Sequence, residues 1–327
     1  MGKFATWLAC GLLAIVAVAA GGVLDRLLAT GFLFTLVGCV LAALYLLGTL
    51  TPSAPLFGRS TRVRDEPGRF ALTFDDGPDP RFTPAISRVL AERGHRATFF
   101  VLGIQASDYP QVLRQLLADG HEIANHGFDH RLLAFSPPTR LRAQLLATEQ
   151  AIATATGRPP ARLFRAPHGV CSPWLGHTVG RLGYRVCGWN GRIFDTAEPG
   201  VPAIVERACR HLRSGAILLL HDADGSGRGG DRSQTVAALP AILEEAERRG
   251  LRSVWLSSLL EPPLERPTGG PTAPAPRDAI AKALAVFDLE REGPRGETGL
   301  ARSGQPLENG DGEPLAGEKE EAQAHSD

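Results

Sequence analysis

Two adjacent carboxylates, Asp75 and Asp76, follow the apolar run Phe70-Ala71-Leu72 and precede Gly77-Pro78. Neighbouring side chains on a strand point to opposite faces, so both acids can share one site only where the strand ends and the backbone turns. Glycine and proline permit such a turn. There, one carboxylate can bind a metal ion while the other acts on a water molecule. The alternative is an ordinary acidic turn, since Asp, Gly and Pro are all common turn residues.

A pair of histidines four residues apart, His126 and His130, offers two nitrogen ligands. Residues at this spacing can lie close together on one helical turn or in a compact loop. With one carboxylate they supply two nitrogens and one oxygen and leave a position open for water, as in catalytic zinc sites. Such pairs also occur without any metal, so the fold must bring this one to the two aspartates.

Short apolar runs alternate with helix-length segments between about residues 65 and 260. This alternation predicts an α/β fold, with a parallel sheet and helices outside it. The predicted strands are 70–74, 97–101, 122–125, 163–165, 184–189, 216–220 and 251–255. The predicted helices are 83–93, 110–119, 138–156, 173–182, 201–212 and 234–249; several begin near a proline and end before a glycine. Seven strands in this length favour a (β/α) barrel, and no dinucleotide-binding fingerprint follows the first strand.

The polar residues that could do chemistry cluster where these strands end. They are, in chain order, Asp75 and Asp76, His126 and His130, Arg165, Asp195, and His221 with Asp222. In a parallel barrel the C-terminal strand ends share one rim, and active sites lie there. The sequence therefore predicts that these residues form a single site.

The same residues fall in five motifs that resemble those of the polysaccharide deacetylases. These are the family-four carbohydrate esterases, which include chitooligosaccharide and peptidoglycan deacetylases. The motifs are Thr73–Pro78, His126–His130, Arg165–Gly169, the stretch around Trp189 and Asp195, and Leu218–His221. The resemblance extends from about residue 65 to residue 260. It implies a distorted (β/α) barrel of about seven parallel strands, and a metal-dependent deacetylase acting on carbon–nitrogen bonds other than peptide bonds.

The resemblance also implies how the metal and the water would be handled. Asp76, His126 and His130 would hold one divalent ion, with zinc expected first and cobalt or another divalent ion as alternatives. Asp75 would be the general base that deprotonates the attacking water. Arg165 would hold and orient Asp75 and keep it ionised, because a neighbouring cation favours the charged carboxylate.

Four further residues would act on the acyl group and the sugar. The resemblance implies that His221 protonates the departing amine and that Asp195 orients the His221 imidazole. The backbone N–H of His168 would stabilise the oxyanion. Trp189, together with His168, would contact the substrate.

Three positions depart from the family pattern. Gly127 replaces the Ser or Thr that hydrogen-bonds within the metal loop, so a looser loop is expected. His168 replaces the usual aromatic residue, which changes the wall beside the acetyl group. Thr196 replaces the Trp that follows the motif aspartate. An aromatic sugar platform is then either missing or supplied by Trp174 or Trp189.

The first fifty residues consist of two uncharged apolar runs, 4–24 and 27–50, separated by Asp25-Arg26. Each run has the length of about 20 residues that a transmembrane helix needs. They predict a hairpin of two membrane-spanning helices. The alternatives are a signal peptide cleaved near Ala17-Val18-Ala19, or a lipidation box at Leu36–Cys39.

The rest of the chain divides by composition. Residues 51–64 are expected to link the hairpin to a catalytic domain at 65–260, and 261–327, rich in Pro, Gly and Glu, to form a disordered tail. The formal net charge of +0 gives no indication of nucleic-acid binding. The five scattered cysteines argue against a disulfide framework.

The leading functional hypothesis is a membrane-anchored hydrolase that removes an N-acyl group from an amino sugar of a polysaccharide or a lipid-linked glycan. The alternatives are a glycan O-ester deacetylase and a carbohydrate-binding pseudoenzyme of the same fold. Lys3 precedes the first apolar run, and Arg59, Arg62 and Arg64 follow the second. If both runs span, the positive-inside rule places the catalytic domain in the cytoplasm. Members of the family usually act outside the cytoplasm, which favours the other side, so the sequence does not decide on which side of the membrane the catalytic domain lies.

Overall fold

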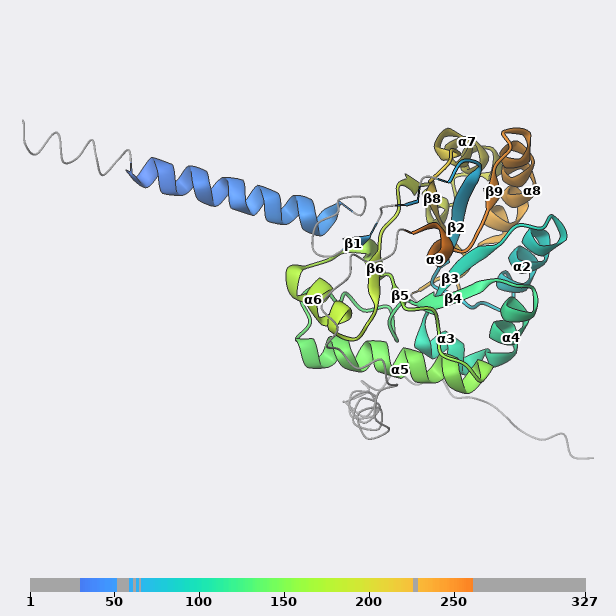
Figure 1. The fold of residues 1–327 in the computed structure, drawn as a ribbon, viewed down its shortest axis with the longest axis horizontal. Helices are drawn as coiled ribbons and strands as arrows, with labels where there is room; N and C mark the ends of the chain where they lie inside the picture. Colours follow the sequence, from blue (N-terminus) through green and yellow to red (C-terminus); the bar gives the residue numbers. More distant parts are fainter. Residues whose placement is uncertain (1–29, 52–58, 61–62, 65, 226–228, 261–327) are drawn as a thin grey trace, which may run out of the picture.

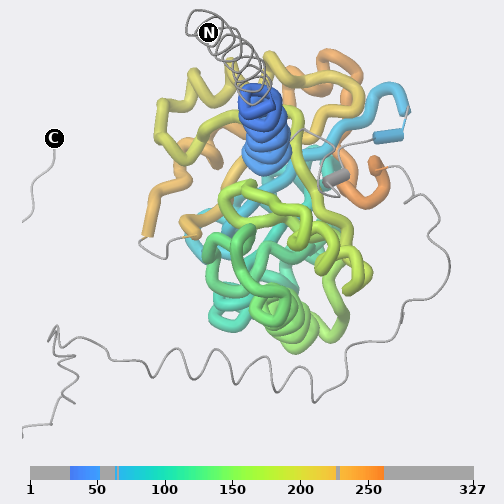
Figure 2. Tube along the Cα trace, turned by 90° about the vertical axis from the view of Figure 1, so that its left-hand side faces the viewer, coloured from blue at the N-terminus to red at the C-terminus, as the bar shows by residue number. Residues whose placement is uncertain are grey.

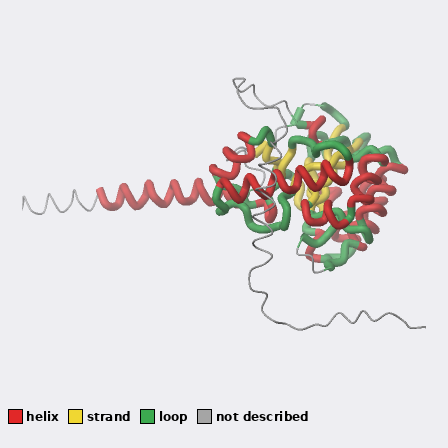
Figure 3. The backbone as a smooth tube through the Cα atoms, turned by 90° about the horizontal axis from the view of Figure 1, so that it is seen from below, coloured by secondary structure: helices red, strands yellow, loops and turns green. Residues whose placement is uncertain are grey.

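The computed structural model describes residues 30–51, 59–60, 63–64, 66–225 and 229–260 of the 327-residue chain. Its centre is a sheet of parallel strands with helices packed around it (Figures 1 and 3). Two stretches on which the sequence makes predictions, the first apolar run and the C-terminal tail, lie outside the described residues.

The described strands pair in the order β1-β6-β5-β4-β3-β2-β8-β7, and β9 pairs with the start of β2. All of these strand pairs are parallel. The bounds are β1 Arg59–Ser60, β2 Arg69–Asp75, β3 Ala97–Val101, β4 Glu122–Asn125, β5 Leu163–Phe164, β6 Arg185–Cys187, β7 Gly191–Arg192, β8 Ile217–His221 and β9 Arg252–Ser253. Among these residues no pairing joins β1 to β7, so the sheet is an open barrel.

The predicted parallel α/β fold is confirmed, with two strands more than the seven expected from the sequence. The additional strands, β1 and β7, have two residues each, too few to give an apolar pattern. Part of the predicted linker also belongs to the domain, because β1 pairs with β6 and Val63 bridges to Leu260.

The helices end within a residue or so of the predicted bounds. They are α2 Thr83–Glu92, α3 Gly103–Asp108, α4 Pro110–Ala118, α5 Pro138–Thr156, α6 Pro173–Arg181, α7 Val201–His211, α8 Ser233–Arg248 and α9 Leu256–Leu259. The sequence analysis missed α3 and α9, which are too short to show a helical period. Five of the predicted helices carry proline in the first turn, where its missing N–H costs no hydrogen bond.

Side chains on β2 alternate between the two faces of the sheet, as a strand requires. Phe70, Leu72 and Phe74 join the hydrophobic core under the helices, whereas Ala71 belongs to the cluster inside the barrel. The same alternation puts Asp75 on the inner face at the C-terminal end of the strand. Both faces are buried, which explains why the strand is almost continuously apolar.

The short helix α9 closes the N-terminal end of the barrel. Leu256 and Leu259 pack into the interior cluster. The Leu256 N–H donates to the Thr98 hydroxyl (2.9 Å), and the Ser257 N–H donates to the Glu122 carboxylate (3.3 Å). The interior therefore opens at the opposite rim, where the strands end.

An apolar helix, Thr30–Leu50, extends away from the domain (Figure 1) and is seen nearly end-on in Figure 2. Its mean hydropathy is 2.2 and only 11% of its most apolar window is buried, so it is long and apolar enough to cross a membrane or to serve as a signal sequence. It meets the domain at its C-terminal end, where the Thr49 carbonyl accepts from the Cys171 N–H (3.2 Å). This helix corresponds to the second predicted span; the first, at residues 4–24, lies outside the described residues.

Candidate active site

The turn after β2 brings the two adjacent carboxylates into one pocket. Asp75 is the last residue of β2, and Asp76 adopts φ = 79°. Few non-glycine residues adopt a left-handed φ, but aspartate tolerates it. The expected turn thus occurs at Asp76 itself rather than at Gly77. Glycine is needed at 77 for a different reason, because a Cβ there would lie 2.1 Å from a carboxylate oxygen of Asp222.

The two histidines reach the same pocket from the loop that follows β4. The His126 and His130 Nε2 atoms lie 3.2 and 3.0 Å from the Oδ1 of Asp76. His126 Nδ1 lies 2.9 Å from the Arg165 carbonyl oxygen. That carbonyl can only accept, so Nδ1 carries the proton and the Nε2 lone pair points toward Asp76.

Hydrogen bonds from neighbouring elements fix the loop that carries both histidines. The Asn125 side chain accepts from the Gly127 N–H (2.9 Å). Gln144 on α5 accepts from the Phe128 N–H (2.7 Å) and donates to the Asp129 carboxylate (2.7 Å). The looser loop expected from Gly127 is therefore held by Gln144, a residue that the sequence analysis did not identify.

Asp76, His126 and His130 fit a divalent metal ion. Their ligand atoms lie within 4.8 Å of one another. The Asp76 Oδ1 atom is buried and has no hydrogen-bond partner among the described residues, although two imidazole nitrogens lie close to it. A buried carboxylate oxygen without a partner is costly, and a cation between these atoms would satisfy it. Two nitrogens and one oxygen suit zinc and leave a position open.

The ionisation of this triad also favours a cation. Burial alone would raise the pKa of Asp76, but His126 and His130 outweigh it and hold that pKa well below its usual value. Burial would lower the pKa of His130, yet Asp76 raises it overall. Asp76 is thus ionised, and a negative carboxylate favours positive charge beside it.

Asp75 is held by a buried arginine. An Nη1–H of Arg165 donates to Oδ1 of Asp75 (2.7 Å) and to the Thr73 hydroxyl (2.8 Å). Arg165 is fully buried, and its guanidinium lies 4.1 Å from the centre of the Phe100 ring. A buried, hydrogen-bonded ion pair of this kind fixes the carboxylate in one orientation.

His221 and Asp195 form a second pair, and His221 is the register partner of Asp75 on the adjacent strand β8. His221 Nδ1 lies 2.9 Å from Asp195 Oδ1, and the His221 N–H donates to Oδ2 (2.8 Å). The Thr235 hydroxyl also donates to Oδ2 (3.0 Å). Burial alone would lower the pKa of His221, but Asp195, with smaller contributions from Asp76 and Asp75, raises it to about 9.

We expect Asp195→Asn to shift the alkaline limb of the pH–kcat profile to lower pH. A raised pKa keeps the imidazole protonated until the pH passes that pKa, so the acid form is lost as the pH rises. Removing the Asp195 carboxylate removes the main cause of the raised pKa of His221. Thr235→Val is the matched control, because it removes one hydrogen bond and leaves the carboxylate charge in place. An unchanged alkaline limb in Asp195→Asn would contradict this role.

The pocket itself has a volume of about 330 Å³. Of the residues predicted from the sequence, it is lined by Asp75, Asp76, His126, His130, His168, Trp189 and His221. Arg165 and Asp195 are buried behind it, each bonded to a lining residue. The structure thus brings these nine predicted residues to one place, whereas Asp222 does not line the pocket.

The walls of the pocket differ from those expected in two respects. Trp174 does not line it; its ring lies 6.5 Å from that of Tyr45 at the end of the N-terminal helix. Arg192 and Phe194, which the sequence analysis did not identify, line the mouth instead. Phe194 is 52% exposed, so an aromatic surface is available despite Thr196.

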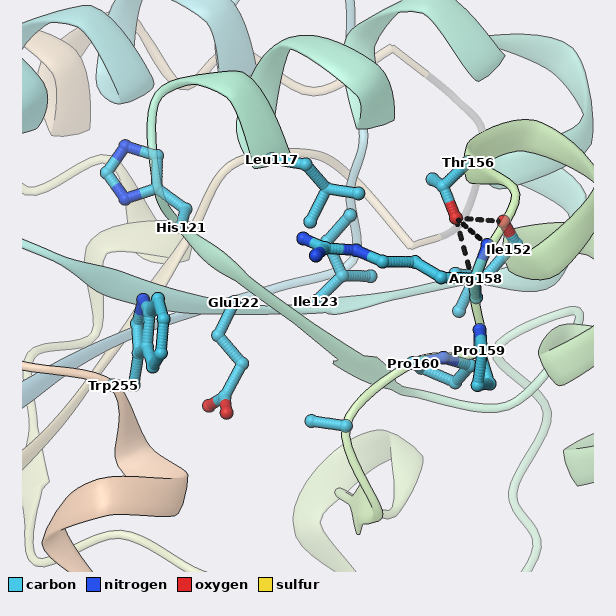
Figure 4. Close-up of a pocket in the computed structure, with 11 residues that line it drawn as sticks. Leu117, His121, Glu122, Ile123, Ile152, Thr156, Arg158, Pro159, Pro160 and Trp255 are labelled. Carbon is cyan, nitrogen blue, oxygen red and sulfur yellow. Dashed lines mark hydrogen bonds between the residues drawn. The ribbon is translucent and has the colours of Figure 1, made fainter.

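A second cavity, of about 260 Å³, lies at the other end of β4 (Figure 4). It is bounded by Glu122 and Trp255, with Thr156 bonded to the backbone of Arg158 at its far side. Burial raises the pKa of Glu122, whose carboxylate already accepts from Thr98 and Ser257. This cavity contains none of the residues predicted for the site.

Comparisons with known proteins agree with this geometry. Residues 62–187 match the polysaccharide deacetylase family model. A peptidoglycan-N-acetylglucosamine deacetylase from Bacillus cereus is 38% identical over 192 residues, covering 58% of this chain and 87% of that protein. A chitooligosaccharide deacetylase from Azorhizobium caulinodans is 34% identical, covering 60% of this chain and 96% of that protein.

A solved structure gives the same picture. A family 4 carbohydrate esterase from Streptomyces lividans, in complex with acetate, superposes with a TM-score of 0.52 at 30% identity, covering 57% of this chain and 91% of that one. Sequence motifs, family model, relatives and fold all agree, and the chain belongs to the polysaccharide deacetylase family, whose members hydrolyse amide bonds of N-acetylated sugars.

Proposed function

We propose that this protein removes the N-acetyl group from an amino sugar within a glycan, using one divalent metal ion. The observation that carries the proposal is the convergence of three sets of residues on one pocket. These are the Asp76–His126–His130 triad, the Asp75–Arg165 pair and the His221–Asp195 pair.

Different residues of the chain carry out the separate steps of amide hydrolysis. A zinc or similar ion held by Asp76, His126 and His130 would supply a Lewis acid at the open side of the triad. Asp75, fixed by Arg165, takes the proton of the attacking water. The backbone N–H of His168, which lines the pocket, is the proposed donor to the developing oxyanion. From the neighbouring strand β8, His221 gives its proton to the departing amine while Asp195 holds the imidazole.

The intact set of residues supports an enzyme over a carbohydrate-binding pseudoenzyme. A binding protein has no use for a general base and a general acid that are each held by a separate buried partner. Ester hydrolysis needs the same attack but less help for its leaving group. His221, held by Asp195, can supply the proton that an amine leaving group needs.

The test is acetate release by the purified full chain. N-acetylated chitooligosaccharide and peptidoglycan fragments represent the amide substrates, and an O-acetylated xylan represents the esters. Faster release from an amide substrate supports the proposal. Release from the ester alone would make the protein an O-deacetylase. Binding of a glycan without any release would indicate the pseudoenzyme.

The exposed apolar helix Thr30–Leu50 supports attachment of this domain to a membrane. If the run at residues 4–24 also spans, the cationic flanks place the domain in the cytoplasm. Its substrate would then be a lipid-linked amino sugar rather than mature polymer.

This topology can be tested with reporters fused to the end of the chain. We expect fluorescence from a reporter that folds only in the cytoplasm and no activity from a phosphatase that needs the extracytoplasmic space. The reverse result would place the domain outside and restore polymeric glycan as the substrate.

A further inference from the structure

Arg192 lies at the mouth of the pocket in a fixed position. It is the last residue of β7, and its register partner on β8 is Leu219, two residues before His221. The preceding residue must be glycine, because a Cβ at 191 would lie 2.4 Å from the Leu218 side chain. The parallel pairing with β8 directs the end of this short strand to the same rim as the catalytic residues.

Two aromatic rings hold the Arg192 side chain. Its guanidinium carbon lies 5.4 Å from the centre of the Trp189 ring and 5.0 Å from that of Phe194. Phe194 adopts φ = 58°, a conformation that costs free energy for a bulky residue and that clusters at ligand-binding sites. Stacking against aromatic faces leaves the N–H edges of a guanidinium free to donate.

Among the described residues that line this pocket, Arg192 has a cationic side chain without a carboxylate partner. The two acidic residues that line the pocket are already paired, Asp75 with Arg165 and Asp76 with the two metal-loop histidines. Asp195, buried behind the pocket, is paired with His221. Arg192 itself is exposed, and its guanidinium packs against the two rings. The mouth of the pocket therefore presents a preorganised and unbalanced positive charge.

We infer that Arg192 binds an oxyanion carried by the glycan substrate, so that the protein selects anionic amino-sugar glycans over neutral ones. The inference rests on the proposed deacetylation at this pocket. Two residues along a strand correspond to roughly 6.6 Å, about the length of one sugar ring, so the oxyanion lies on the reacting sugar or on its neighbour. A planar guanidinium pairs with either a carboxylate or a phosphate through two parallel hydrogen bonds. The carboxylate would belong to an adjoining acidic sugar, and the phosphate to a lipid-linked one.

The test compares matched substrates in the wild-type full chain and in Arg192→Gln. One pair is a peptidoglycan-type oligosaccharide with a free carboxylate and the same oligosaccharide with that carboxylate converted to an amide. The second pair is an N-acetylglucosaminyl diphosphate lipid and a neutral alkyl N-acetylglucosaminide. For at least one charged substrate we expect kcat/KM to fall about 10- to 100-fold in Arg192→Gln, against less than about threefold for its neutral counterpart. The pair that responds identifies the source of the oxyanion.

Two controls separate local contact from general charge. Arg88→Gln, on the exposed side of α2, makes the same charge change away from the pocket and should leave the discrimination unchanged. Arg192→Lys keeps the charge without the planar fork and should retain part of the preference. Equal losses on charged and neutral substrates in Arg192→Gln would overturn the inference.

A binding experiment makes the inference independent of turnover. The same substrate pairs are titrated into Asp75→Asn protein with and without Arg192→Gln. If adding Arg192→Gln lowers the affinity for a charged glycan by about 10- to 100-fold and leaves the affinity for its neutral counterpart unchanged, the subsite is supported. This result would hold even if the wild-type protein released no acetate, an outcome that would refute only the proposed function. No preference for either charged glycan in the Asp75→Asn protein would refute the subsite while leaving the deacetylase proposal intact.

Discussion

Asp75→Asn is expected to lower kcat by about 10²- to 10⁴-fold, which corresponds to roughly 3 to 5 kcal/mol at the barrier. Asparagine has nearly the shape of aspartate but cannot take a proton from water. Asp75 is not one of the three residues whose ligand atoms converge, so the metal content should persist. Steady-state kinetics and elemental analysis of the same preparation measure the two quantities together.

The variant also leaves Arg165 buried without its counter-ion. Breaking a buried pair typically destabilises a protein by about 3 to 5 kcal/mol, so the melting temperature should fall, and circular dichroism must show that the protein remains folded. Asp79→Asn is the matched control, because Asp79 pairs with exposed Arg81 and does not line the pocket. Its kcat should stay within about threefold of wild type. If Asp75→Asn lost its metal as well as its activity, the roles of the two aspartates would have to be exchanged.

The sequence predicted those features of the site that depend only on residues close together in the chain. Asp75-Asp76 before Gly-Pro indicated a strand end, and the spacing of His126 and His130 indicated a ligand pair. Long apolar runs such as Phe70–Phe74 indicated strands buried on both faces, and these formed as expected. Because the strands are parallel, their C-terminal ends lie at one rim of the sheet. This follows from the topology, so the site could be predicted without the exact strand boundaries.

Features that depend on contacts between distant segments could not be predicted in this way. Strand β7 has only two residues and is defined by its pairing with the distant strand β8, so Arg192 and Phe194 had no recognisable local pattern. Gln144 looks like an ordinary helix residue until α5 packs beside the metal loop. Likewise, no local signal distinguishes Trp189, inside the pocket, from Trp174 beside Tyr45.

Removal of the metal is expected to abolish activity altogether. The purified full chain should contain about one divalent ion, and His126→Ala should reduce its metal content to background, because one of three ligands is lost. Chelation of the wild type should have the same effect on activity, and zinc or cobalt should restore it. His177→Ala, an exposed histidine on α6, is the matched control and should keep both metal and activity.

Stability and pH provide readouts of the same site that do not require turnover. An ion that binds only the folded chain stabilises it by about 2.7 kcal/mol at one hundred times its dissociation constant, so chelation should lower the melting temperature of the wild type but not of His126→Ala. Asp76 raises the pKa of His130, so a proton competes with the ion for this ligand. The proton is bound below that pKa and released above it, and metal affinity must therefore fall as the pH falls. Metal content and melting temperature that are identical in wild type and His126→Ala, or full activity in metal-free protein, would show that the triad does not bind the catalytic ion.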